Sequence, residues 1–121
     1  DGVENIHEVL QESMDIEYQN LRDGKISPED YITVTEITSS QVTTQISEFI
    51  TSKPSEQWQE SYINYMEAMK KFNEYILETK VLANQIQNAS PNEQISQTLE
   101  KIESIKAESM QYIKKSNELR P

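Results

Sequence analysis

Apolar side chains recur every three or four residues along most of the chain, a spacing that places them on one face of a helix. The first such series spans residues 3–22 and stops just before Gly24, a residue suited to a helix C-terminus. The pattern predicts a first helix with one inward face. That face comprises Val3, Ile6, Leu10, Met14, Tyr18 and Leu21.

The segment covering residues 28–50 carries two conflicting signals. Ser27 and Pro28 are a typical helix start, because serine caps the first turn and proline suits the first helical position. The residues that follow are rich in β-branched side chains, which favour strands. A lone strand would have no sheet to join, however, and Ile46, Phe49 and Ile50 keep a helical spacing. A second helix is therefore predicted.

Two longer helical series complete the chain. One covers residues 56–87, with Ser55 as its expected cap, and the other begins at residue 92 after Ser90, which is expected to form a capping box with Glu93. Short links between long amphipathic helices imply antiparallel neighbours. The chain is thus predicted to be all-α and one domain, residues 1–121: an antiparallel up-down four-helix bundle with a long third and fourth helix. The inward residues expected of the fourth helix are Ile95, Leu99, Ile102, Ile105, Met110, Tyr112 and Ile113.

Charge narrows the range of partners. The net charge is -10, and residues 1–24 alone carry seven acidic side chains against one basic one. Nucleic acids and anionic membrane surfaces are bound by clustered lysine and arginine, so neither is an expected partner. No apolar run approaches the length of a membrane-spanning helix, so no transmembrane segment is predicted. A basic protein partner stays compatible with this charge.

An acidic ridge on the first helix is the candidate surface for such a partner. Glu4, Glu8, Glu12 and Asp15 follow one another at helical spacing, where like charges repel. This repulsion lowers the stability of the helix, and binding of a basic partner would be a functional reason to keep these acidic residues together. The simpler interpretation is a solvated face that keeps the protein soluble.

The sequence contains few residues from which a catalytic site or a metal site could be built. Glu4 and His7 form an ExxH pattern of the kind found in di-iron bundles, but such sites need two of these motifs. His7 is the only histidine and cysteine is absent, so no metal, cofactor or nucleophile-histidine relay is expected. His7 is instead expected to be a solvated residue on the first helix.

Aromatic residues recur along the third helical series. At this spacing the favoured interpretation is that the rings fill the bundle core. The alternative is a ligand pocket between the helices, lined by Trp58, Tyr62 and Tyr65.

The predicted function is a non-enzymatic helical-bundle domain for protein interaction; the alternative is a small-molecule-binding sensor bundle. The composition is broadly similar to that of small extracytoplasmic helical-bundle lipoproteins of low-GC Gram-positive bacteria, although no motif carries the similarity. We therefore expect the soluble part of a secreted or lipid-anchored bacterial protein; in the lipid-anchored case the membrane anchor would lie upstream of Asp1, and the alternative is a cytoplasmic protein. Because the third and fourth helices exceed the first in predicted length, part of their hairpin is expected to project as a second interaction surface.

Overall fold

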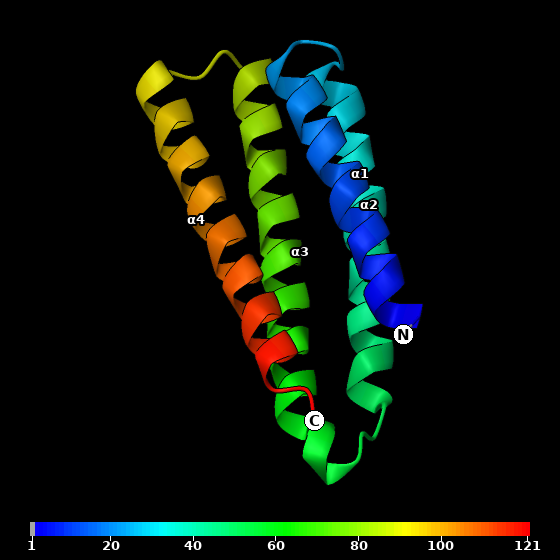
Figure 1. Cartoon of the computed structure of the whole chain (residues 1–121). Helices are drawn as coiled ribbons and strands as arrows, with labels where there is room; N and C mark the ends of the chain where they lie inside the picture. The colour runs from blue at the N-terminus through cyan, green and yellow to red at the C-terminus, as the bar shows by residue number, and fades with distance from the viewer. Residues whose placement is uncertain (1) are drawn as a thin grey trace.

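The computed structural model describes residues 2–121, with side chains from residue 6 onward. Successive helices run in opposite directions (Figure 1), which confirms the predicted all-α four-helix bundle. The third and fourth helices are the longest of the described chain, with 29 and 27 residues. The described elements are α1 (Gly2–Arg22), α2 (Pro28–Thr51), the short 3-10 helix η1 (Glu56–Trp58), α3 (Gln59–Gln87) and α4 (Asn92–Glu118).

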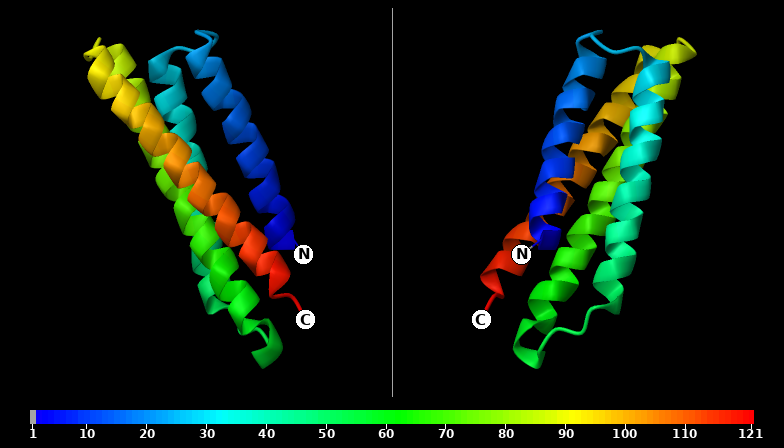
Figure 2. Two further views of the ribbon diagram at one scale, coloured as in Figure 1. Left: turned by 60° about the vertical axis from the view of Figure 1, so that its left-hand side comes forward. Right: turned by 90° about the vertical axis from the view of Figure 1, so that its right-hand side faces the viewer.

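The helix α3 is the centre of the assembly. It packs along α2 on one side and along α4 on the other, whereas α1 lies against α2 and only lightly against α3. Within the described residues, no Cα atom of α1 comes within 8 Å of a Cα atom of α4. Figure 2 shows that α4 crosses α3 at an oblique angle, so the four helices are not arranged as a regular square in cross-section. The least extensively packed helix is therefore α1.

The end of the bundle that projects differs from the one expected. The connection between α2 and α3 extends past the start of α1 and the end of α4, while the connection between α3 and α4 is level with its neighbours (Figure 1; Figure 2). The expected projection of the third and fourth helices is thus replaced by a projection of α2 and α3.

The helix α2 forms despite its β-branched composition. The backbone N–H of Asp30 donates to the Ser27 hydroxyl oxygen at 3.1 Å, so the predicted cap is present. The Thr35 hydroxyl donates to the carbonyl oxygen of Ile32 at 2.6 Å, which satisfies the buried side chain within the helix itself. Similar bonds to a carbonyl one turn back are made by Thr33, Thr43 and Thr44.

Two helices end in Schellman motifs, in which a residue with positive φ allows two amides to bond back to the last turn. At the end of α1 this residue is Gly24, with φ 74°, as its position in the sequence predicted. At the end of α3 it is Ala89, with φ 51°. This left-handed conformation is energetically unfavourable for any residue that has a Cβ atom. The turn after α3 therefore forms without a glycine at the position of positive φ. The amide bonds run from Gly24 to Leu21, Lys25 to Asn20, Ala89 to Ile86 and Ser90 to Gln85.

Two predicted caps are wrong. The helix α4 begins at Asn92 after Pro91 with no side-chain cap hydrogen bond, so the capping box at Ser90 does not form. Ser55 precedes η1 rather than α3 and likewise makes no side-chain cap bond. At α4 the residue in the cap position is Pro91, whose side chain has no oxygen that could accept a hydrogen bond from the first amides.

Buried positions of α2, α3 and α4 alternate at spacings of three and four residues, the repeat of an antiparallel coiled coil. Serine, threonine and alanine occupy many of these positions alongside large side chains. The predicted core is wrong in part, because Ile6 and Met110 face solvent. The side chain of Val3 lies outside the described residues, so its place in the core stays a prediction. The α4 series is Thr98, Ile102, Ile105, Ser109 and Ser116.

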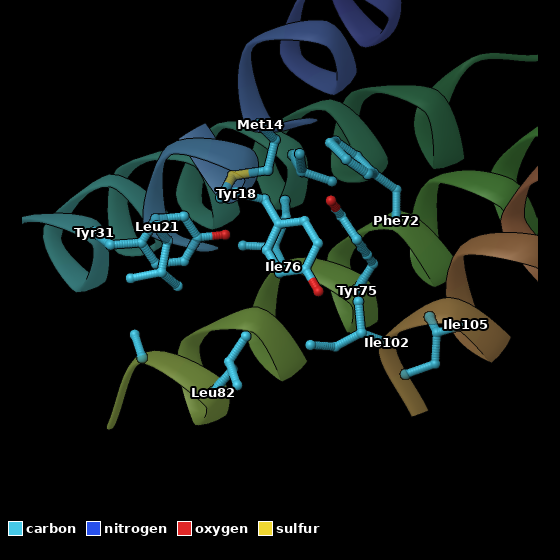
Figure 3. Packing of buried hydrophobic residues seen from close by; sticks show 12 residues of the cluster. Met14, Tyr18, Leu21, Tyr31, Phe72, Tyr75, Ile76, Leu82, Ile102 and Ile105 are labelled. Atoms are coloured by element: carbon cyan, nitrogen blue, oxygen red, sulfur yellow. The ribbon is translucent and has the colours of Figure 1, made fainter. Parts of the chain in front are cut away.

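The centre of the core is built from aromatic and aliphatic side chains of all four helices (Figure 3). Tyr18 of α1 meets Tyr75 of α3 edge to face, with ring centroids 5.9 Å apart. Further along the bundle, small residues let α3 and α4 approach closely. The Ser61 hydroxyl donates to the Ser116 carbonyl oxygen, and the Ser116 hydroxyl donates to the Ser61 carbonyl oxygen, both at 2.8 Å.

Candidate functional site

The histidine expected to be solvated is in fact buried, with 1% of its surface exposed. The His7 ring packs edge-on against Tyr65 and Phe72 of α3, at centroid distances of 5.5 and 5.1 Å. Neither ring nitrogen has a hydrogen-bond partner within the described residues. Because burial strips the charged form of its hydration, the pKa of His7 falls from 6.5 to about 4. His7 is therefore a neutral core residue at neutral pH.

The four carboxylates of the predicted ridge are not equivalent. Glu8 and Glu12 are exposed on α1, and the side chain of Glu4 lies outside the described residues. Asp15 turns inward, where it accepts a hydrogen bond from the Tyr75 hydroxyl at 3.1 Å. The same Asp15 oxygen lies 3.5 Å from Nζ of Lys106. Asp15 thus connects α1 to α3 and α4. Of the ridge carboxylates whose side chains are described, Glu8 and Glu12 are the ones exposed to a partner.

A row of apolar side chains on the outside of α1 was missed by the sequence reasoning. Ile6, Val9 and Ile16 are 52%, 63% and 61% exposed. They recur at intervals of three and seven residues, so they share one stripe on the helix surface. A signal was present in the sequence: α1 contains more apolar residues than one inward face can hold, and Val9 and Ile16 fit no position on that face. We refer to Ile6, Val9, Ile16, Glu8 and Glu12 together as the α1 face.

A shallow groove continues the α1 face toward α2. It has a volume of about 340 Å³ and is bordered by Ile6 and Leu10 of α1 and by Gln45 and Glu48 of α2. The Gln45 side-chain oxygen is buried there without a partner among the described residues. Glu48, at the border of the groove, is a further carboxylate, and it lies on the side of the apolar stripe opposite Glu8 and Glu12.

A second concave surface lies at the projecting end of the bundle. This hollow, between the end of α2 and the start of α3, has a volume of about 480 Å³. We call it the α2–α3 hollow. Its lining residues are Phe49, Ile50, Ser52, Lys53, Pro54, Gln59, Tyr62, Ile63 and Met66.

The three residues predicted to line a ligand pocket are divided by the structure. Tyr62 lines the α2–α3 hollow and stacks on Phe49, with ring centroids 4.9 Å apart. Trp58 does not line the hollow, but its ring meets Tyr62 edge to face at 6.3 Å. Tyr65 is buried in the core between Phe49 and His7. One of the three predicted residues therefore borders the hollow directly.

No family model, curated protein or solved structure matches the chain. Among the described residues, no helix combines the length and apolar character needed to cross a membrane. No group of three or more acidic or histidine side chains in the described part of the chain is arranged to hold a metal ion. The α1 face and the α2–α3 hollow are the two features from which a function can be inferred.

Proposed function

We propose that this protein is a non-enzymatic interaction domain whose α1 face binds a basic amphipathic helix of a partner protein. The observation that carries the proposal is the exposed stripe of Ile6, Val9 and Ile16 beside carboxylates that pair with no lysine or arginine among the described residues. An apolar stripe on a solvent-facing helix has no role in the bundle core. It is the kind of surface that an amphipathic helix covers by ridge-and-groove packing.

The charges around the stripe determine the sign of the partner. At about 100° per residue, Glu8 and Glu12 lie along one side of the stripe, and Glu48 of α2 borders the groove on the other side. No lysine or arginine among the described residues pairs with these three carboxylates. A partner helix with lysine or arginine on both flanks of an apolar ridge would complement this pattern.

The two parts of the α1 face contribute differently to binding. Covering half-exposed valine and isoleucine side chains contributes about 1 kcal/mol each, largely independent of salt. The carboxylates accelerate association and favour the right partner, and their effect is screened as ionic strength rises. A surface that serves only to keep the protein soluble would have the carboxylates without the apolar stripe.

The proposal is tested with a synthetic amphipathic peptide of leucine and lysine, titrated into the full chain at low and high ionic strength. Reversing Glu8 and Glu12 to lysine should weaken binding at least tenfold at low salt. The matched control reverses Glu56 and Glu60, which have the same spacing and are also exposed, and so changes the net charge equally. This control should retain most of the affinity.

The apolar stripe is tested in the same assay. Val9→Ser and Ile16→Ser should weaken binding at both ionic strengths, whereas Ile37→Ser, at an equally exposed isoleucine on α2, should not. Equal binding by wild type and by the Glu8 and Glu12 reversal would overturn the proposal. Equal binding of a leucine and glutamate peptide would overturn it as well.

We also propose that the domain is the soluble part of a secreted or lipid-anchored bacterial protein. The absence of cysteine and the abundance of serine, threonine, asparagine, glutamine and lysine support this proposal. Fractionation of the producing cells tests it: the protein is expected in the envelope or the medium, and recovery in the cytosol would contradict the proposal.

A further inference from the structure

We propose that the α2–α3 hollow binds a single-chain amphiphile with an anionic head, such as a medium-chain carboxylate. The alkyl chain would lie among the apolar walls, and the carboxylate would lie at Lys53. This inference concerns the projecting end of the bundle and does not depend on the function proposed for the α1 face.

The size and walls of the hollow fit a short alkyl chain. Its volume of about 480 Å³ falls within the range of roughly 300–1,000 Å³ found for small-molecule sites. Phe49, Tyr62 and Met66 line it, and methionine adapts readily to ligands of different shape. Ile50 and Ile63 also line it, although they are 60% and 55% exposed. A bound chain would remove part of this apolar surface from water.

The charge at the hollow is opposite to that of the whole protein. The chain has 21 acidic residues against 11 lysines and arginines. Among the residues that line the hollow, however, Lys53 is the one charged side chain, and there is no carboxylate. Lys53 is exposed and pairs with no acid among the described residues. A cation beside an apolar concavity is the arrangement that recognises an anionic amphiphile rather than a neutral or cationic one.

The C-terminus of α2 lies beside the hollow, and hydrogen bonds there reduce its repulsion of an anionic ligand. The C-terminal carbonyl groups of α2 carry partial negative charge, which would repel an anion. The Ser52 backbone N–H and hydroxyl both donate to the Phe49 carbonyl oxygen, at 3.2 and 2.7 Å. These two bonds satisfy one of the carbonyl groups closest to the hollow.

The walls also provide a reporter of binding. Trp58 is the single tryptophan of the chain, and its ring contacts Tyr62, which lines the hollow. A ligand that displaces water from Tyr62 is therefore expected to change the fluorescence of Trp58.

The experiment titrates the full chain with octanoate, decanoate and dodecanoate below their micelle concentrations, followed by calorimetry and Trp58 fluorescence. Affinity should rise about fourfold for each added methylene until the hollow is filled, with one ligand per chain. Each carboxylate should bind more tightly than the alcohol of equal length. Lys53→Gln should abolish this difference, while Lys25→Gln, at an exposed lysine in the α1–α2 connection, should preserve it.

The location is tested with Ile63→Asn, which places a polar group on the wall, and with Ile37→Asn as the matched control at an exposed isoleucine of α2. Circular dichroism verifies that both variants stay folded. Loss of decanoate binding in Ile63→Asn alone supports the site. Absence of decanoate binding by wild type, equal binding by Ile63→Asn, or equal affinity for alcohol and carboxylate would each overturn the proposal. Reversal of Glu8 and Glu12 should leave decanoate binding unchanged, so a failure at the α1 face is distinguishable.

Discussion

The folded bundle should lose stability as the pH falls from about 7 to about 4, because His7 is buried in its neutral form. The unfolded chain takes up a proton at His7 near the ordinary pKa of 6.5, whereas the folded chain resists protonation until about pH 4. Below pH 6.5 the unfolded state therefore binds more protons than the folded state, and acidification favours unfolding. Above pH 6.5 the residue is neutral in both states and contributes no pH dependence.

The size of the effect follows from the two pKa values. The gap between 6.5 and about 4 corresponds to a loss of about 3 kcal/mol once the pH is below both values, and about 2 kcal/mol is already lost at about pH 5. Domains of this size are stable by only about 5–15 kcal/mol. A single side chain would thus remove a large part of the stability of the bundle.

Urea unfolding at a series of pH values measures this loss, with His7→Leu as the variant that cannot titrate there. The variant keeps every carboxylate, so the difference between the two pH profiles isolates His7. A direct measurement is also available, because His7 is the only histidine and its ring proton gives an unambiguous NMR titration. The expected midpoint in the folded protein is about pH 4.

Two results would refute the reasoning about His7. Parallel loss of stability by wild type and His7→Leu between pH 7 and pH 5 would show that the carboxylates, not the histidine, cause acid unfolding. An NMR midpoint near the ordinary value of 6.5 would show that the ring is solvated and that α1 does not pack against Tyr65 and Phe72 as described.

Two further predictions concern the helix ends. Gly24→Ala should destabilise the protein by about 1 kcal/mol and Ala89→Gly should stabilise it by a similar amount, since both positions require positive φ; urea unfolding of the two variants should move the midpoint in opposite directions. Ser27→Ala should cost about 1 kcal/mol because it removes an observed cap, whereas Ser55→Ala, which removes none, should leave the same midpoint unchanged. Midpoints that move in one direction, or equal losses at the two serines, would contradict these assignments.

The fold could be predicted from the sequence because helix signals agreed over most of its length. The hardest segment was α2, where β-branched residues favoured a strand. The cap at Ser27 and the continued helical spacing outweighed that preference. Threonine is tolerated in this helix because its hydroxyl can bond to a carbonyl in the preceding turn, as Thr35 does. Local propensity was the weaker signal, as it often is when a buried face determines the structure.

The details of the core were harder to predict because burial was assigned to apolar residues alone. On α4, the repeat of seven residues after Ile102 leads to Ser109 and then Ser116, both of which are buried. Selecting the more apolar neighbour instead led to Met110, which is exposed. A serine can occupy a core position between two close helices when its hydroxyl donates to a carbonyl oxygen, and for Ser109 and Ser116 the α3 carbonyl oxygens of Ala68 and Ser61 accept that bond.

His7 was misplaced for a related reason. It lies seven residues before Met14 and fourteen before Leu21, so it shares their inward face on α1. A polar residue type was taken as evidence of exposure, although the repeat already placed it inside. The α2–α3 hollow is a different case. It depends on the path of residues 52–58 between two helices, and periodicity within the helices contains no information about that path.

The helix α1 carries both the buried histidine and the proposed partner surface. Acid should therefore lower the stability of the folded chain, and a bound partner should raise it. A partner present at a hundred times its dissociation constant would stabilise the folded chain by about 2.7 kcal/mol. This gain is close to the roughly 3 kcal/mol that protonation of His7 removes. Because α1 packs only lightly on α3 and does not touch the backbone of α4 within the described residues, it is the helix on which either effect would act most directly. A bound basic helix should therefore shift acid unfolding to lower pH, and the shift should become smaller at the same partner concentration when Glu8 and Glu12 are reversed.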